Sequence, residues 1–129
     1  MENKDLIKFD GYSVENFSVK KNINISEKQK NTIDIKYDTY VNNDKKLKNF
    51  YRSEFIIKIY TEISEIYIEF DGFFTISEKL NEEDKKYFLN ITAATILYPY
   101  VRTFISNVTS FDKGDPVILP IINFADRNF

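Results

Sequence analysis

The spacing of hydrophobic residues in this chain changes once, near residue 80, and that change constrains the fold more than any other feature. Before residue 80, apolar side chains recur at every second position, as in Ile33, Ile35 and Tyr37, which is typical of a strand with one buried face. After residue 80 they recur every three or four positions over about seven turns, which is typical of an amphipathic helix. The sequence therefore predicts an α+β fold in which a sheet is followed by one long helix.

Four segments show the two-residue spacing, and the connections between them are short. These segments cover residues 12–19, 33–41, 55–62 and 66–76. The first changes phase at Asn16, which predicts a β-bulge there. Gly72 in the fourth is expected to let the strand kink or bulge, because glycine carries no side chain. Strands in this order with short connections predict a four-stranded antiparallel sheet.

The start and end of the predicted helix are marked by residues that favour such positions. Asn81 is expected to cap the helix, and the acidic residues 82–84 then occupy the first turn, where the helix dipole favours negative charge. Pro99 is expected to kink the helix because proline lacks an N–H and its ring crowds the preceding turn. Gly114 and Pro116 are expected to end it.

Some apolar surface of the sheet and of the helix lies outside the predicted core. Tyr40 and Tyr60 fall on the sheet face opposite the aliphatic one, where they either decorate the surface or contact another chain. Leu89, Ile96 and Leu97 fall off the main stripe of the helix. The helix then either meets a second subunit or lies wholly on its own sheet with a few apolar residues exposed.

The composition excludes much catalytic chemistry. The chain contains no cysteine and no histidine, which removes thiolate nucleophiles, the commonest general base and the commonest metal ligands. Glu69 and Asp71 alternate on one strand face and are the best remaining carboxylate pair for an enzyme such as a glycosidase, but acidic residues two apart are common on solvated strands. The acidic residues 82–84 already serve the helix start. We therefore predict no enzyme, no cofactor and no metal.

Length, charge and apolar runs also limit the class of partner. A chain of 129 residues predicts one domain over residues 1–129 with one core. The net charge of −2, with Lys and Arg scattered among acidic residues, argues against nucleic acid as a partner. No segment reaches the ~20 apolar residues that span a bilayer, and the acidic start is followed by no apolar run of signal-peptide length. We therefore expect a cytoplasmic protein that does not insert into membranes.

Two motifs in the C-terminal third resemble the bacterial export chaperone family SecB. The first is Ile-Leu-Tyr-Pro-Tyr-Val-Arg-Thr-Phe-Ile-Ser at residues 96–106, and the second is Pro-Val-Ile-Leu-Pro-Ile-Ile-Asn-Phe at residues 116–124. The likeness is specific in order and spacing over about residues 91–124 and is weaker upstream. Arg102, within the first motif, is interpreted as a structural residue that pairs with a carboxylate or a carbonyl.

The resemblance implies a subunit that assembles into dimers, and into a dimer of dimers, through the long helix. It also implies an ATP-independent holdase that binds extended, unfolded polypeptides in apolar grooves. The residues implied at the oligomer interface are Tyr98, Pro99, Tyr100, Val101, Phe104 and Ile105.

Capture of many different polypeptides needs exposed apolar pockets, and aromatic residues make up 16% of this chain. Phe73 and Phe74 are adjacent on one strand, so they point to opposite faces and at least one is expected outside the subunit's own core. The residues predicted to bind clients are Phe17, Tyr40, Tyr60, Phe73, Phe74 and Phe111.

Two features leave the partners open. The chain stops five residues after Phe124, where SecB continues into another helix and an acidic tail, so we expect a more open groove without a helical lid. Glu69 lies where the family presents acidic residues to the translocase motor SecA, and it is the candidate docking residue. The alternative to a general export or protective holdase is a dedicated chaperone for one partner, such as an antitoxin.

Overall fold

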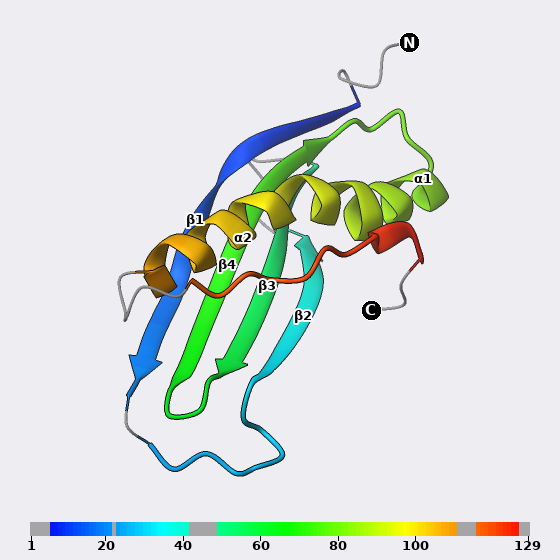
Figure 1. The fold of residues 1–129 in the computed structure, drawn as a ribbon. Helices are drawn as coiled ribbons and strands as arrows, with labels where there is room; N and C mark the ends of the chain where they lie inside the picture. The colour runs from blue at the N-terminus through cyan, green and yellow to red at the C-terminus, as the bar shows by residue number, and fades with distance from the viewer. Residues whose placement is uncertain (1–5, 22, 42–48, 111–115, 127–129) are drawn as a thin grey trace.

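The computed structural model describes residues 6–21, 23–41, 49–110 and 116–126. Its strands are β1 (Ile7–Lys20), β2 (Thr32–Val41), β3 (Phe50–Tyr60) and β4 (Glu65–Ile76). Its helical segments are α1 (Glu82–Tyr87), η2 (Phe88–Thr92), α2 (Ala93–Ser110) and η3 (Phe124–Asp126). The predicted architecture, a four-stranded antiparallel sheet followed by a long helix, is confirmed (Figure 1).

The four strands form one sheet in the order β1-β4-β3-β2, and every neighbouring pair is antiparallel. β1 has an irregularity between Val14 and Asn16, where the sequence predicted a bulge, and a second one between Phe9 and Gly11. Gly11 has a φ of 123°, which a side chain would strain. The bulge predicted at Gly72 is absent, because Gly72 pairs in register with both neighbouring strands.

Gly72 instead allows the helix to approach the sheet. A Cβ atom at this position would lie only 2.7 Å from Cδ1 of Leu97 on α2. The glycine is therefore required by packing rather than by backbone conformation.

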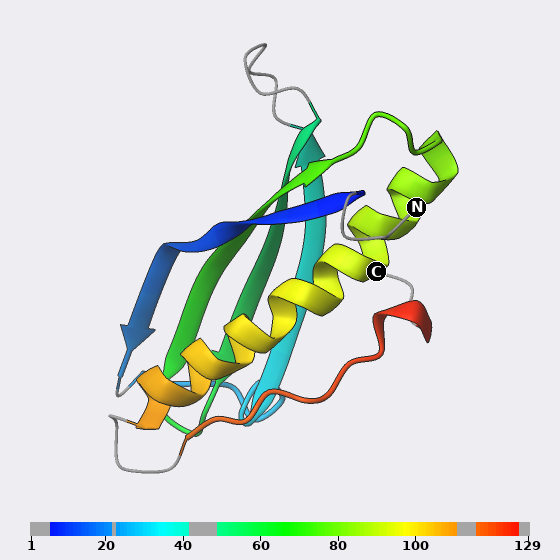
Figure 2. The same cartoon turned by 90° about the horizontal axis from the view of Figure 1, so that it is seen from above.

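The helical run lies across one face of the sheet, which we call the inner face (Figure 2). Strand residues on this face pack against α2 and form the core with it. The fully buried large side chains of this core include Phe55, Ile57, Ile68, Phe70, Phe74, Leu97, Val101 and Ile105. The opposite, outer face is not covered by any helix of the described part of the chain.

The helix begins where the sequence predicted and is continuous from Glu82 to Ser110, apart from a wider π-helical turn at Phe88–Thr92. The side chain of Asn81 accepts a hydrogen bond of 2.8 Å from the backbone N–H of Asp84, which confirms the cap. Pro99 lies inside α2, and the kink expected there stays a prediction. Gly114 lies outside the described residues.

The π-helical turn, which the sequence did not predict, is attached to the sheet by Tyr37. The Tyr37 hydroxyl lies 2.6 Å from the Leu89 carbonyl oxygen and 2.9 Å from Ser53 Oγ. Since a carbonyl can only accept, Tyr37 donates to Leu89, and the fully buried Ser53 is left to donate to Tyr37. Burial raises the pKa of Tyr37 well above its ordinary value, so the hydroxyl keeps its proton.

The C-terminal segment, residues 116–126, runs back beside α2 (Figure 1). Leu119 and Phe124 are buried in the core. Side chains from successive turns of α2 hold the segment by its backbone: Tyr98 hydroxyl donates to Pro120 O (2.6 Å), Arg102 Nε to Leu119 O (3.2 Å) and Ser106 Oγ to Val117 O (3.1 Å). Arg102 thus binds a carbonyl, as its structural interpretation requires.

Candidate functional site

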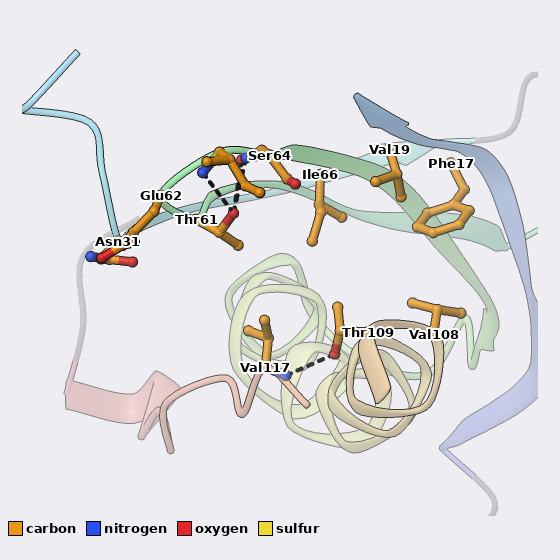
Figure 3. A pocket seen from close by; sticks show the side chains of 11 residues that line it. Phe17, Val19, Asn31, Thr61, Glu62, Ser64, Ile66, Val108, Thr109 and Val117 are labelled. Atoms are coloured by element: carbon orange, nitrogen blue, oxygen red, sulfur yellow. Dashed lines mark hydrogen bonds between the residues drawn. The ribbon is translucent and has the colours of Figure 1, made fainter. Parts of the chain in front are cut away.

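A cavity of about 470 Å³ opens between the end of β1, the β3–β4 turn and the C-terminal part of α2 (Figure 3). We call it the turn cavity. Its lining residues are Phe17, Val19, Asn31, Thr61, Glu62, Ile63, Ser64, Ile66, Val108, Thr109 and Val117.

The bulge in β1 directs two apolar side chains toward this cavity. Val14, Phe17 and Val19 pair with Phe70, Ile68 and Ile66 of β4, so all three lie on the inner face. If the strand alternated regularly from Val14 without a bulge to absorb the extra residue, Phe17 and Val19 would point to the outer face. They remain 39% and 40% exposed. Phe17 meets the helix through an edge-to-face contact with Phe104, with ring centroids 5.5 Å apart.

The β3–β4 turn forms one wall of the turn cavity and is held by local hydrogen bonds. Thr61 Oγ1 accepts from the backbone N–H of Ser64 at 3.0 Å (Figure 3). The Thr61 N–H donates to the Ser64 carbonyl at 2.9 Å. The Ile63 carbonyl in turn accepts from the Ile23 N–H at 3.0 Å. Glu62 adds a carboxylate to a lining that otherwise carries no ionisable side chain.

The helix and the C-terminal segment form the facing wall. The buried Thr109 hydroxyl donates to the Ile105 carbonyl and accepts from the Val117 N–H, both at 2.7 Å (Figure 3). This bond holds Val117 next to Thr109, so that Val117 lines the cavity together with Val108. Thr109 therefore joins two segments whose apolar side chains line the same space.

The turn cavity has the properties of a pocket for apolar side chains. Its volume lies within the range of about 300–1,000 Å³ found for pockets that bind small ligands. Most of its walls are aliphatic or aromatic, and Ile66 at its base is buried while Phe17, Val19 and Ile63 keep exposed surface. Apolar groups entering it would lose contact with water, which favours binding without a fixed pattern of hydrogen bonds.

The residues predicted to bind clients do not form one surface. Phe17 lines the turn cavity, and its client-binding role stays a prediction. Phe74 points to the inner face and is fully buried in the core, so its side chain presents no surface to a client, and we do not retain it. Phe111 lies outside the described residues.

The other three, Tyr40, Tyr60 and Phe73, lie on the outer face. The Arg52 guanidinium lies 4.3 Å from the centroid of the Tyr40 ring, and Phe73 stacks on Phe50 with centroids 5.9 Å apart. These three residues belong to the opposite side of the sheet, and none of them lines the turn cavity.

The residues predicted at the oligomer interface divide in a similar way. Tyr98, Val101 and Ile105 are at most 4% exposed because they belong to the subunit's own core, which removes them from the candidate contact surface. Pro99 is exposed, Tyr100 is 43% exposed and Phe104 is half-buried. An interface on this helix would therefore use these three.

Acidic residues cluster on the outer face rather than in the turn cavity. Glu69 is half-buried and accepts a hydrogen bond of 2.6 Å from the Tyr67 hydroxyl, which raises the pKa of Tyr67 to about 12. Asp71 is 2% exposed and binds Arg52. Glu69 and Asp71 do share one strand face, as predicted, but neither lines the turn cavity.

Of the residues that line the turn cavity, only Phe17 was predicted as a site residue. The apolar lining residues that were missed are Val19, Ile63, Ile66, Val108 and Val117. The phase change at Asn16 carried the information for Val19, and the apolar stripe of the helix included Val108. The position of Val117 depends on its bond to Thr109, a contact between segments that no local pattern reveals.

Within the residues that the structure describes, no group of three or more acidic, histidine or cysteine side chains is arranged to hold a metal ion. In the same residues, no helix combines the length and apolar character that crossing a bilayer demands.

Sequence comparisons relate the chain to export proteins. The family model "Preprotein translocase subunit SecB" matches residues 10–127. An uncharacterized protein of Methanocaldococcus jannaschii, MJ0357, is 31% identical over 130 residues, covering 95% of this chain and 82% of that protein. The protein-export protein SecB of Ehrlichia chaffeensis is 40% identical over 63 residues, covering 44% of this chain and 36% of its own length. The protein-export protein SecB of Orientia tsutsugamushi (strain Boryong) is 34% identical over 65 residues, covering 50% of this chain and 40% of its own length.

Two solved structures share the fold. The Mycobacterium tuberculosis SecB-like chaperone Rv1957, in complex with a ChAD peptide from the HigA1 antitoxin, superimposes with a TM-score of 0.67 at 16% identity, over 97% of this chain and 94% of that one. A Streptococcus agalactiae protein of unknown function superimposes with a TM-score of 0.61 at 13% identity, over 89% of this chain and 97% of that one. Because the family model spans most of the chain and the fold agrees with it, this chain belongs to the SecB family.

Proposed function

We propose that this protein is an ATP-independent holdase chaperone that binds unfolded or precursor polypeptides without catalysing a reaction. The observation that carries the proposal is the turn cavity, whose walls keep apolar side chains partly exposed in an otherwise folded subunit. Membership in the SecB family supports the same function.

An extended client is the form of polypeptide that suits this site best. β1 is an edge strand of the sheet, so one side of its backbone has no strand partner within the described residues. An extended segment beside β1 would place every second side chain on the inner face, where Phe17 and Val19 border the turn cavity. Backbone hydrogen bonds at an edge do not depend on the client's sequence, and this tolerance is what a holdase requires.

One such cavity gives weak binding by itself. Complete burial of one Leu or Phe side chain contributes about 1.5–3 kcal/mol, and association also costs translational and rotational freedom. Useful affinity therefore needs several sites on one client, which self-association into a homodimer or homotetramer would provide. Pro99, Tyr100 and Phe104 are our proposed contact surface for a second copy, and the Tyr100 ring lies 4.8 Å from that of the half-exposed Tyr12.

The site can be tested with two matched substitutions. Phe17 on β1 and Tyr40 on β2 are both aromatic, both on edge strands and both 39% exposed, but only Phe17 lines the turn cavity. Phe17→Ser is expected to weaken binding of a permanently unfolded, fluorescently labelled polypeptide about tenfold, which corresponds to about 1.4 kcal/mol. Tyr40→Ser is expected to leave the Kd unchanged. If Phe17→Ser binds the polypeptide as tightly as wild type and Tyr40→Ser binds it more weakly, the client site lies on the outer face and not in the turn cavity.

A dedicated chaperone for one partner is the second candidate. It is favoured by the shared fold with the Mycobacterium tuberculosis protein, whose structure contains an antitoxin peptide. A general holdase suppresses aggregation of several unrelated unfolded proteins at stoichiometric ratios, whereas a dedicated chaperone protects one partner only. Light scattering of heated, unrelated client proteins separates the two.

An export role would add a contact with the translocase motor SecA and a cytoplasmic location. Glu69 remains our proposed docking residue on the outer face. Titration calorimetry of SecA against wild type and Glu69→Gln would test this contact, and unchanged affinity would remove Glu69 from it.

A further inference from the structure

The outer face contains a row of acidic residues that simple electrostatics disfavours. The strand register places Asp38 of β2 opposite Glu54 of β3, and Glu54 opposite Asp71 of β4. Like charges directly opposite each other in a sheet are destabilising. The row therefore needs a compensating interaction at its centre.

Arg52 supplies part of that compensation. Its Nη1 lies 3.1 Å from Glu54 Oε2 and 3.1 Å from Asp71 Oδ2, and its guanidinium stacks on the Tyr40 ring. One guanidinium balances one of the two carboxylates, so the pair would still carry an excess negative charge if both were ionised.

Asp71 shows where the compensation is incomplete. The side chain is 3% exposed, and its Oδ1 is buried with no hydrogen-bond partner among the described residues. A buried acceptor without a donor costs about 1–3 kcal/mol, and more when it carries charge. The side chains opposite Asp71 are Ser13 of β1, whose hydroxyl donates to Glu15, and Glu54 of β3. Two carboxyl groups can bond to each other only through a proton.

We propose that Glu54 and Asp71 form a proton-sharing pair in the folded sheet, and that loss of the shared proton weakens the fold. Glu54 is the member that carries the proton, because Oδ1 of Asp71 needs a donor while Oδ2 is already bound to Arg52. The protonation state of this pair on the outer face therefore makes the stability of the fold depend on pH.

The pKa of Glu54 agrees with this assignment. The pKa of Glu54 is raised from 4.5 to about 7, first by burial and then by the hydrogen bond and charge of Asp71, while the charge of Arg52 opposes the increase. The charged and titratable groups around Glu54 on the three strands are Lys36, Asp38 and Tyr40 of β2, Arg52 of β3, and Tyr67, Glu69 and Asp71 of β4. No described helix packs on this face, so no further charge faces the pair from a second layer.

The sign of the pH effect follows from the raised pKa. Between pH 4.5 and about 7 the folded protein holds the Glu54 proton more tightly than the unfolded chain does. The free energy of unfolding therefore falls as pH rises through this window, and the contribution of the pair is lost above it. The chain has no histidine, so the side chain that usually titrates in this range does not contribute.

Glu54→Gln tests the proposal because its amide can donate to Asp71 Oδ1 as the protonated acid does. Urea unfolding of wild type from pH 5 to pH 8 is expected to show a midpoint that declines with pH, and Glu54→Gln is expected to lose that decline. Asp34→Asn, which removes a carboxylate of the outer face opposite Lys58, is the matched control and is expected to keep the wild-type slope. Equal slopes for Glu54→Gln and wild type would overturn the proposal.

A direct titration of wild type decides the question even if Glu54→Gln does not fold. The side-chain carboxyl carbon of Glu54, followed by carbon-13 NMR, is expected to titrate with a midpoint near 7. A midpoint near the ordinary 4.5 would show that the two groups share no proton.

Discussion

The contact between Gly72 and Leu97 gives the most quantitative test of how the helix sits on the sheet. Replacing Gly72 with alanine would place a Cβ 2.7 Å from Cδ1 and 2.9 Å from Cδ2 of Leu97, whereas ordinary contacts begin at 3.4 Å. Leu97 is fully buried, so its movement is limited by the surrounding core. Overpacking of this kind costs about 1–3 kcal/mol, and removing a glycine from a strand recovers about 0.5–1 kcal/mol. Gly72→Ala is therefore expected to lower the free energy of unfolding by about 0–2.5 kcal/mol.

A double-mutant cycle isolates the clash. Leu97→Ala removes both Cδ atoms and should cost about 2–5 kcal/mol as a large-to-small change in a core. In that background Gly72→Ala should be neutral or slightly stabilising, because the atoms it would strike are gone. The assay is urea unfolding followed by far-ultraviolet circular dichroism, since the chain has no tryptophan. If Gly72→Ala costs the same in both backgrounds to within about 0.5 kcal/mol, the close approach of helix and sheet is refuted.

Two further substitutions test the polar contacts that hold the helix and the C-terminal segment. Tyr37→Phe removes the hydroxyl that binds Ser53 and Leu89, so it should cost about 1–3 kcal/mol in urea unfolding and speed amide hydrogen exchange around η2; unchanged exchange there would contradict this attachment. Thr109→Val leaves the half-buried Val117 N–H without its acceptor, so it should cost a similar amount and speed proteolysis of residues 116–126; equal cleavage rates would argue against the anchor.

Hydrophobic spacing was sufficient to predict the architecture because each element buries one face. The alternation of Ile33, Ile35 and Tyr37 and the acidic first turn after Asn81 are local patterns, and both elements formed where expected. The phase change at Asn16 likewise predicted the bulge. β1 was predicted to begin at residue 12 but starts at Ile7, because the irregularity before Gly11 interrupts the simple alternation.

The functional surfaces could be predicted only in part because they depend on contacts between distant segments. Phe73 and Phe74 look equivalent in sequence, yet the register places Phe74 in the core and Phe73 on the outer face beside Phe50. The helical stripe likewise did not separate residues such as Tyr98, buried under η3, from the exposed Tyr100. No pattern in the sequence indicated a role for Glu54, since its role in the proposed pair depends on its position opposite Asp71.

The proposed holdase function is tested most directly by the native mass of the purified protein, measured by light scattering with and without a permanently unfolded polypeptide. The proposal predicts a dimer or tetramer whose mass increases by that of the bound polypeptide. A monomer whose mass stays unchanged when the polypeptide is added would contradict it.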